Sequence, residues 1–561
     1  MTLPPLRDPM PDFVRVASTA DLADGEMRQV SADGTEVLLS RVDGAFHACT
    51  AFCTHYGAPL ATGVLDGTTV VCPWHHAAFD VASGALCEPP APDALRTFEV
   101  RVEGEDVLVR VPADADEHGK GIAYRESDGE TPAMTDIDLD ADDRLLLILG
   151  AGAAGEACAE ALRQQGYRGR LVMVSQETRP PYDRTALSKG YLGGGTADDA
   201  LRLRDGSFFE QHGIELWTDR TVTALDPDTR TVTFAEGDPI TYDAALVATG
   251  GVPRRLPIPG ADLDGVLVLR SWQDAQALVS RVGDATSVVL IGASFIGMEA
   301  ASSLVGRGLN VTVIGQETTP FEGILGTEVG QVFREAAEAK GVTFRLGASV
   351  ERIETVHSDP EVGPPTRLRV ALGEDAVAAD VVVMGVGVRP ATDFLSRAPF
   401  VREDGGIEVD AYLQAAPGLF AAGDVAAFPE ARLGRRVRIE HWRLAQQHGR
   451  AAARGLLHEA DPTLPRTPFD AVPFFWTGQF GVSLRYVGHV EDWDEVIIDG
   501  SLADREFVAA YVEGGEVRAV AAVGRDKDAA AAHRLMARGA MPTPEEVRNG
   551  VDWQSRLAHL G

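Results

Sequence analysis

The chain has 561 residues. That is too long for one hydrophobic core and predicts about three to four domains. Apolar residues make up 45% of the sequence, and no stretch approaches the roughly 20 consecutive apolar residues of a membrane helix. The formal net charge of −33 argues against binding to nucleic acid or to anionic lipid, because so acidic a surface repels both. The first residues show no charged segment followed by an apolar run, so no secretion signal is expected and a cytoplasmic location is the default prediction.

Residues 1–112 have the pattern of a small β-domain. Short alternating runs such as 36–42 and 98–102 are separated by Asp-Gly and Glu-Gly turns. Residues 113–143 hold eleven acidic side chains against two basic ones, which predicts a solvated linker. As a flexible coil such a linker spans roughly 30 Å, so the N-terminal domain could dock on its own chain or on a partner chain.

Two short motifs in the N-terminal domain predict a metal centre. Cys53 and His55 are followed, after sixteen residues, by Cys72 and His75, which gives C-x-H and C-x-x-H on two loops. A Rieske [2Fe–2S] cluster needs this donor set, two cysteines on one iron and two histidines on the other. A Cys2His2 zinc site is the alternative. His76 is interpreted as a solvent-side or secondary neighbour of the ligands.

From residue 144 the pattern changes to strand, glycine turn and helix. The apolar strand 145–149 is followed by the three glycines of a G-x-G-x-x-G motif, Gly150, Gly152 and Gly155. These glycines allow a tight turn, the approach of a pyrophosphate and close packing of helix on strand. A helix is predicted from Glu156. Glu177, 22 residues beyond the last glycine, is expected to bind the adenosine ribose hydroxyls.

The same pattern recurs between residues 288 and 317, which indicates a second nucleotide-binding module. Gly292 and Gly297 flank this turn, and Ser294 replaces the middle glycine. Glu317, 20 residues beyond Gly297, predicts NADH rather than NADPH, because a carboxylate accepts ribose hydroxyls and repels a 2′-phosphate. An ordinary glycine-lined turn is the alternative.

Together these residues resemble the apoptosis-inducing-factor-like and ferredoxin-reductase-like flavoproteins, in the subgroup with an N-terminal Rieske domain. The resemblance covers nearly the whole chain except the acidic linker. It implies a multidomain fold with an all-β Rieske domain, two Rossmann-like α/β nucleotide-binding domains of the glutathione-reductase type and a C-terminal α+β domain. The implied boundaries are 1–112 for the Rieske domain, 113–143 for the linker, 144–259 with 391–465 for the FAD domain, 260–390 for the NAD domain and 466–561 for the C-terminal domain.

The resemblance also implies which side chains surround the flavin. The FAD contacts beyond the first glycine turn and Glu177 would be Arg184, Lys189, Thr249, Gly250, Asp424 and Trp442, with Gly387 beside the nicotinamide. Lys189 would lie near flavin N5 and pair with Glu299, where a cation stabilises the anionic reduced flavin. The alternative is a surface lysine and a helix-surface glutamate.

The implied activity is NADH oxidation through FAD, with electrons passing to the Rieske cluster and on to an external protein or small molecule. Cys49 and Cys87 are expected to be core or loop thiols. Cys158, the one cysteine beyond residue 90, is expected to be small and buried, so dithiol chemistry is not expected. Three alternatives stay open: an NADH oxidase, an NADH-sensing redox signalling protein, and a zinc-stabilised binding module on an ordinary ferredoxin reductase. The sequence leaves open the final acceptor and the oligomeric state, a homodimer included.

Overall fold

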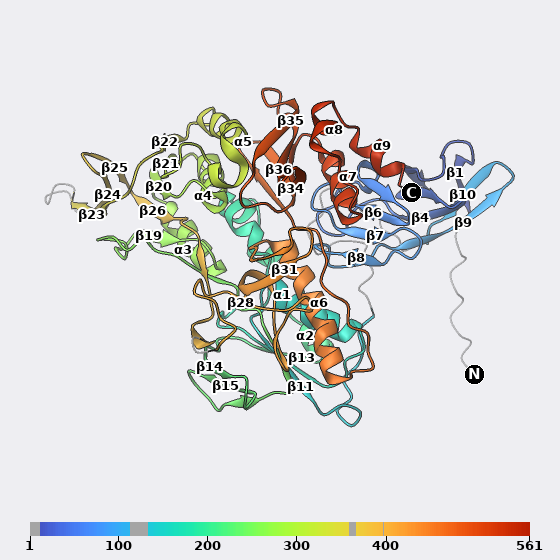
Figure 1. Cartoon of the computed structure of the whole chain (residues 1–561), viewed down its shortest axis with the longest axis horizontal. Helices are drawn as coiled ribbons and strands as arrows, with labels where there is room; N and C mark the ends of the chain where they lie inside the picture. Colours follow the sequence, from blue (N-terminus) through green and yellow to red (C-terminus); the bar gives the residue numbers. More distant parts are fainter. Residues whose placement is uncertain (1–11, 113–132, 358–365, 396–397, 561) are drawn as a thin grey trace, which may run out of the picture.

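The computed structural model describes residues 12–112, 133–357, 366–395 and 398–560. In Figure 1 the N-terminal β-domain and the second nucleotide-binding module lie on opposite sides of the molecule. The C-terminal domain lies between them, above the first nucleotide-binding module. The predicted architecture of four structural parts is therefore confirmed.

Antiparallel sheets form the N-terminal domain, as its alternating runs predict. One sheet has the strand order β1-β10-β9-β4-β3-β2, with β1 (Val14–Ser18), β2 (Met27–Ala32), β3 (Thr35–Val42), β4 (Ala45–Thr50), β9 (Thr97–Glu103) and β10 (Asp106–Arg110). The other has the order β5-β6-β7-β8, with β5 (Val64–Asp66), β6 (Thr69–Val71), β7 (Ala78–Asp80) and β8 (Leu86–Glu88), and the short helix η1 (Leu60–Thr62) precedes it. Strand β3 is buried on both faces, since Val37 and Leu39 pack in one apolar cluster and Leu38 packs in another.

The first nucleotide-binding module is built on a mainly parallel sheet of order β13-β12-β11-β17-β30-β29, in which only the β29–β30 pairing is antiparallel among the described strands. Its strands are β11 (Leu145–Leu149), β12 (Arg170–Val174), β13 (Ile214–Trp217), β17 (Ala244–Val247), β29 (Gln414–Ala416) and β30 (Leu419–Ala421). Smaller sheets flank it, with β14 (Val222–Asp226), β15 (Thr231–Phe234), β16 (Ile240–Thr241), β18 (Gly251–Pro253), β27 (Val388–Pro390), β28 (Ile407–Glu408), β31 (Ala426–Glu430) and β32 (Arg435–Val437). Every residue of β11 is buried, as its unbroken apolar run predicts.

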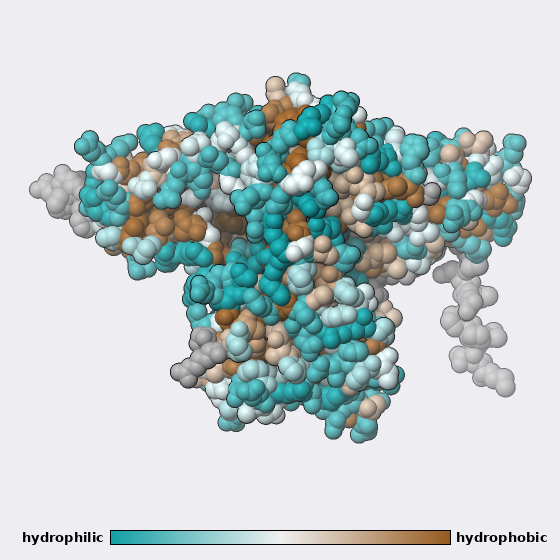
Figure 2. Space-filling view, in the orientation of Figure 1, coloured by the Kyte–Doolittle hydropathy of each residue, from teal (hydrophilic) through white to brown (hydrophobic). Residues whose placement is uncertain are grey.

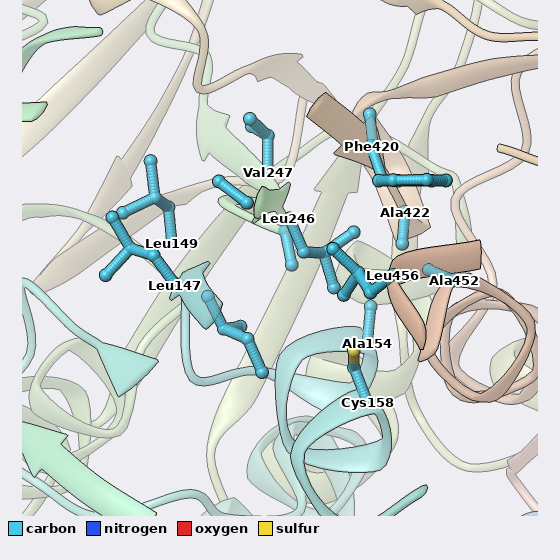
Figure 3. Close-up of a cluster of buried hydrophobic side chains, with 14 of the residues drawn as sticks. Leu147, Leu149, Ala154, Cys158, Leu246, Val247, Phe420, Ala422, Ala452 and Leu456 are labelled. Atoms are coloured by element: carbon cyan, nitrogen blue, oxygen red, sulfur yellow. The ribbon is translucent and has the colours of Figure 1, made fainter. Parts of the chain in front are cut away.

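Helices α1 (Ala153–Gln164) and α6 (Trp442–Ala460) pack against each other beside this sheet. Figure 3 shows their small and apolar side chains, Ala154 and Cys158 from α1 and Ala452 and Leu456 from α6, meeting the strand residues of the core. Cys158 is fully buried, as predicted. Helix α1 begins at Ala153, three residues before the predicted start, because extended Gly152 caps it and the motif's last glycine lies within its first turn.

The remaining helices of this module are short. They are η2 (Arg184–Ala186), η3 (Leu187–Tyr191), η4 (Asp198–Leu201), α2 (Phe208–Gln211), η5 (Asp393–Leu395) and η6 (Gly423–Val425).

The second module repeats the design with a parallel sheet of order β19-β26-β20-β21-β22. Its strands are β19 (Val266–Val268), β20 (Ser287–Ile291), β21 (Asn310–Ile314), β22 (Thr343–Arg345) and β26 (Val381–Met384). Its helices are α3 (Trp272–Val282), α4 (Phe295–Gly306) and α5 (Glu322–Glu338), and a side sheet holds β23 (Arg352–His357), β24 (Thr366–Leu372) and β25 (Asp375–Ala379). Helix α3 begins with a capping box between Ser271 and Asp274, which satisfies the free N–H groups of its first turn.

The C-terminal domain is an antiparallel sheet with helices packed on it. The strand order is β33-β34-β37-β36-β35, with β33 (Phe474–Gln479), β34 (Val482–Gly488), β35 (Glu495–Ser501), β36 (Glu506–Glu513) and β37 (Glu516–Val523). Helix α7 (Asp526–Ala537) packs on β34 and β37, and α8 (Pro544–Arg548) and α9 (Trp553–Ala558) follow. The aromatic run at 474–477 forms the start of β33, as predicted.

The predicted linker divides into two parts. Residues 113–132 lie outside the described residues. Residues 133–143 are bound to the first module, since the N–H groups of Thr135 and Asp138 donate to the carbonyls of Arg163 and Arg168 at 3.0 and 2.9 Å. Most residues of this second part are exposed, as a solvated segment would be, but its backbone hydrogen bonds attach it to the end of α1 and to the turn after that helix.

The face of the molecule shown in Figure 2 is mainly hydrophilic, with apolar residues in separate patches. A hydrophilic surface is what the acidic composition predicts. No helix in the described part of the chain combines the length and the apolar character needed to cross a membrane.

The crossing of α1 and α6 generates a stability prediction. A Cβ at Gly449 would clash with the carbonyl oxygen of Ala154, so Gly449→Ala is expected to lower the free energy of unfolding by about 1–3 kcal/mol through overpacking. Gly306→Ala on α4 is the control, because a Cβ there meets no atom within 4 Å and alanine favours a helix by about 1 kcal/mol over glycine. Urea denaturation of both variants measures the difference, and equal stability of the two would contradict the close crossing.

Candidate functional site

The four predicted metal ligands lie on two loops with the same turn geometry. Cys53 and His55 follow β4, and Cys72 and His75 lie between β6 and β7. The N–H of each cysteine donates to the carbonyl five residues later, at 2.9 Å for Cys53 and 2.8 Å for Cys72. These matching turns bring both cysteines and both histidines to one tip of the domain.

At this tip the donors stand in pairs. The thiols of Cys53 and Cys72 hydrogen-bond to each other, and the Nδ1 atoms of His55 and His75 lie 2.9 Å apart. Burial raises the pKa of Cys53 well above its usual value and lowers the pKa of His55 to about 4, so this imidazole is neutral, as a metal ligand must be. Among the residues that the structure describes, no three His, Cys, Asp or Glu side chains converge on a single metal position. Two thiols and two neutral imidazoles fit the donor set of a Rieske cluster.

Backbone N–H groups point at both sulfur atoms. The N–H groups of His55 and Tyr56 donate to the sulfur of Cys53, and those two and three residues after Cys72 donate to its sulfur in the same way. Burial opposes ionisation of Cys72, but these donors and the thiol of Cys53 outweigh it and lower its pKa. Such hydrogen bonds stabilise negative charge on the sulfurs of an iron–sulfur site.

The tip packs against the rest of the chain, although Trp74 beside His75 is 36% exposed. His55 is 2% exposed. The next residue, Tyr56, donates from its hydroxyl to Asp183 at 2.6 Å, on the loop before η2. The His75 ring lies 4.4 Å from the ring of Trp476 on β33. Sequence reasoning missed Tyr56 and Trp476 as contacts of the site, and nothing in their spacing could have revealed them, because both contacts join residues more than 100 positions apart.

His76 was predicted to be either a solvent-side or a secondary neighbour of the ligands, and the structure contradicts the first of these. It is fully buried, and its ring stacks on Phe474 with centroids 3.9 Å apart. The physical reason is that the N-terminal domain packs on the C-terminal domain at this loop, so the side that would face water in an isolated domain is covered. Cys49 is a buried core thiol and Cys87 an exposed one, in agreement with the prediction.

A buried charge network holds another side of the N-terminal domain. Arg204, 8% exposed, pairs with Glu160 of α1 and with Asp93 at 2.8 Å, and donates to the carbonyl of Pro92 at 2.9 Å. On α6, Arg443 donates to the carbonyl of Pro89 at 2.8 Å. Buried charges are tolerated because each is paired or hydrogen-bonded.

The first glycine turn has the geometry expected of a phosphate-binding loop. Gly150 has φ +112°, and a Cβ on it would clash with the carbonyl of Ala248. A Cβ on Gly155 would clash with the carbonyl of Gly150, whereas a Cβ on Gly152 would meet no atom within 4 Å. Two glycines are therefore required by packing, and the third borders open space at the helix N-terminus, where a pyrophosphate would lie.

Glu177 lies after β12, where a carboxylate for ribose is expected, but protein groups already bind it. Arg184 donates to one oxygen at 2.8 Å, and the hydroxyl of Tyr182 donates to the other at 2.6 Å. Both side chains belong to the loop that the resemblance places beside the flavin. This contact fixes the loop relative to the sheet, and the ribose role stays a prediction.

The other predicted flavin contacts gather at the carboxyl ends of the same parallel strands. Gly250 has φ +66°, and the hydroxyl of Thr249 donates to the carbonyl of Ala391 at 2.8 Å. Asp424 on η6 accepts a hydrogen bond from Arg270 at 2.7 Å. Trp442 begins α6. In doubly wound sheets this edge is where ligands bind.

Lys189 and Glu299 form an ion pair, with Nζ 2.8 Å from the carboxylate. Glu299 is 4% exposed and also accepts hydrogen bonds from Ser188 and Thr477, each at 2.6 Å. The predicted pairing is confirmed, and a helix-surface glutamate is excluded. Thr477 follows Trp476 on β33, so one strand contacts both this ion pair and the histidine tip.

The second glycine turn reproduces the first. Gly292 also has φ +112°, and Cβ atoms on Gly292 and Gly297 would clash with the carbonyls of Gly385 and Gly292. Ser294 caps its helix with φ −95° and ψ −173°, close to φ −84° and ψ −165° at Gly152. Serine fits this position because the backbone conformation there is one that any residue adopts.

Glu317 lies beyond β21 with a free acceptor. Its Oε2 is buried and has no hydrogen-bond partner among the residues that the structure describes. A buried unpaired carboxylate oxygen is costly unless a ligand supplies a donor, and ribose hydroxyls are such donors. Gly387 has φ +88°, and no atom lies within 4 Å of a Cβ placed on it, so its surroundings are open.

Comparison with known proteins assigns all three parts of the chain. Residues 12–99 match the Rieske [2Fe-2S] domain, residues 145–449 match pyridine nucleotide-disulphide oxidoreductase and residues 474–557 match the reductase C-terminal domain. Apoptosis-inducing factor 3 of Homo sapiens is 36% identical over 537 residues, covering 95% of this chain and 85% of that protein. Rhodocoxin reductase of Rhodococcus erythropolis is 32% identical over 414 residues, covering 74% of this chain and 94% of that protein.

Solved structures agree with these matches. The ferredoxin reductase for the CYP199A2 system from Rhodopseudomonas palustris aligns with a TM-score of 0.66 and 31% identity, over 72% of this chain and 97% of that one. The covalent putidaredoxin reductase–putidaredoxin complex aligns with a TM-score of 0.68 and 28% identity, over 74% and 98%. The chain therefore belongs to the pyridine nucleotide-disulphide oxidoreductase family, as a ferredoxin-reductase-like flavoprotein oxidoreductase that uses FAD and NADH and carries a Rieske [2Fe–2S] domain.

Proposed function

We propose that the chain oxidises NADH and passes the electrons through FAD to the cluster on its own N-terminal domain, and from there to an external acceptor. When bound, FAD takes a hydride from NADH and supplies single electrons to the cluster. Relatives named ferredoxin reductases, such as the one from Rhodopseudomonas palustris, support an iron–sulfur protein as the receiver of flavin electrons. In this chain such a receiver is part of the same polypeptide.

The observation that carries the proposal is the position of the histidine tip. Tyr56, next to the His55 ligand, is bonded to Asp183 of the flavin-side loop, and His75 contacts Trp476. Burial is the main cause that lowers the pKa of the His75 imidazole, and the charges of His55, Arg485 and Lys189 act in the same direction with smaller effects. The tip and the predicted flavin site are therefore neighbours within one chain.

The side chains have simple tasks in this scheme. Cys53, His55, Cys72 and His75 would hold the cluster. Lys189, oriented by Glu299, would place a positive charge beside the flavin and stabilise its reduced anionic form. Glu299 is buried whereas the Lys189 side chain is 28% exposed, so the carboxylate holds the cation from the protein side of the pair. Positioning and electrostatics suffice, because the cofactors supply the redox chemistry.

Anaerobic titration with NADH tests the proposal. A Rieske-type EPR signal is expected to grow after the flavin absorbance bleaches, in protein that contains iron and acid-labile sulfide. A flavin that bleaches while the cluster stays oxidised would reject the internal route. Zinc at the four ligands would reduce the chain to a flavin reductase with a binding module, and rapid oxygen uptake without an added acceptor would favour an NADH oxidase.

Replacing Lys189 tests the role of the cation. Lys189→Met is expected to lower the midpoint potential of the bound flavin by about 30 mV, which equals about 1.4 kcal/mol for two electrons, because the reduced anion loses its positive neighbour. Lys340→Met is the control, since Lys340 is exposed at the end of α5. Spectroelectrochemical titration of the two variants measures the change, and equal potentials would place Lys189 away from the flavin.

Glu317 is expected to set the choice of nicotinamide. Glu317→Ala removes the free acceptor and is expected to lower the ratio of kcat/KM for NADH over NADPH by about tenfold, the effect of losing about 1.4 kcal/mol. Glu335→Ala, an exposed glutamate on α5, is the matched control. Steady-state assays with both nucleotides decide, and an unchanged ratio would remove Glu317 from the ribose site.

A further inference from the structure

The two cluster loops share a turn in which one backbone position favours glycine. The N–H four residues after each cysteine donates back to the cysteine carbonyl, from Gly57 at 2.9 Å and from His76 at 3.1 Å. Gly57 has φ +68° and His76 has φ +56°. Glycine adopts this left-handed conformation freely, whereas a histidine there is strained. The backbone of the second loop is therefore strained at His76, whereas glycine leaves the first loop unstrained at the matching position.

The side chain of His76 leaves its own domain and contacts the C-terminal domain. The Nδ1 atoms of His76 and His533 lie 2.9 Å apart, so one ring donates and the other accepts. The His76 ring stacks on Phe474 at 3.9 Å, and its neighbour His75 contacts Trp476 at 4.4 Å. Phe474 and Trp476 are two residues apart on β33 and so lie on one face of that strand. Two consecutive histidines of the cluster loop therefore contact two side chains on the same face of β33.

Helix α7, which carries His533, makes a second contact with the N-terminal domain. Asp66 at the end of β5 pairs with Arg534 at 2.6 Å and with Arg538 at 2.5 Å. Its side chain is 2% exposed. Val64 of β5 and Val71 of β6 are buried in one apolar cluster with Phe474 and with residues of α7. This interface has a dry core like that of a single domain, which opposes repeated opening.

We propose that His76 is a positioning residue that latches the cluster loop onto the C-terminal domain through His533 and so holds the cluster in its electron-accepting position throughout turnover. This inference rests on the proposed internal electron route and adds that the N-terminal domain does not travel between reduction and release of electrons. The strain at His76 is retained because its side chain makes a contact between two domains of the same chain, with a residue 457 positions away. A loop with glycine at this position would keep its turn and would lose the contact with His533.

His76→Gly isolates the latch, because it removes the imidazole and relieves the backbone. Stopped-flow mixing with NADH is expected to show unchanged flavin bleaching and cluster reduction slowed by about tenfold, the effect of losing 1.4 kcal/mol of docking free energy at 25 °C. Hydrogen exchange of the 474–479 and 526–537 segments is expected to rise. Asp33→Gly is the matched control, since Asp33 has φ +52° in an exposed turn of the same domain, and both measurements should stay at wild-type values.

His533→Ala and the double variant test the coupling of the pair. The double variant is expected to reduce its cluster no more slowly than the slower single variant, because the two rings act through one contact. Additive losses, or wild-type rates and exchange in His76→Gly, would overturn the latch. If His76→Gly binds no cluster, hydrogen exchange in His533→Ala tests the latch instead, because His533 lies far along the chain from the predicted ligands. If NADH does not reduce the cluster of the wild-type protein, the proposed function is rejected. The hydrogen-exchange data test the latch in that case as well.

Discussion

The burial of the histidine tip is the constraint on which the rest of the structure depends. An iron–sulfur cluster exchanges electrons only with groups close to it. A cluster on the same chain can therefore accept flavin electrons only if the histidine tip lies near the flavin. Here Tyr56 and His75 bring that tip against Asp183 and Trp476. Trp476 and Thr477 are adjacent on β33, and alternation along the strand sends the first toward the tip and the second toward Glu299. One strand therefore sets the spacing between the metal site and the ion pair at the predicted flavin site.

The interface that fixes this spacing combines charges with apolar packing. Arg204 joins α1 to the N-terminal domain, and Asp66 joins that domain to α7. Removing one partner of such buried pairs leaves an uncompensated charge, which costs several kcal/mol, so the pairs penalise separation more than they add to stability. The acidic surface, net charge −33, repels other acidic chains, whereas these inward arginines are matched by carboxylates of the same chain.

The two nucleotide turns show how much of this family's site is backbone geometry. Gly150 and Gly292 share φ +112°, and each has a carbonyl where a Cβ would be. Ser294 stands where the first turn has Gly152, and both residues are extended. The backbone conformation of the middle position therefore suits any residue, whereas the close approach of a carbonyl requires glycine at the outer two. Cys158 is buried in the α1–α6 contact, and burial raises the pKa of its thiol, which opposes its ionisation.

The sequence by itself determined the chemistry of each part, because that chemistry depends on local spacing. C-x-H and C-x-x-H predicted the metal donors, and the glycine turns with their buried strands predicted both nucleotide sites. The tertiary structure alone decided how the parts meet. The docking of the N-terminal domain, the roles of Tyr56, Trp476 and His76, and the attachment of residues 133–143 all depend on contacts between distant segments. Local patterns carry no record of such contacts, which is why the burial of His76 against the C-terminal domain did not follow from its position beside the predicted ligands.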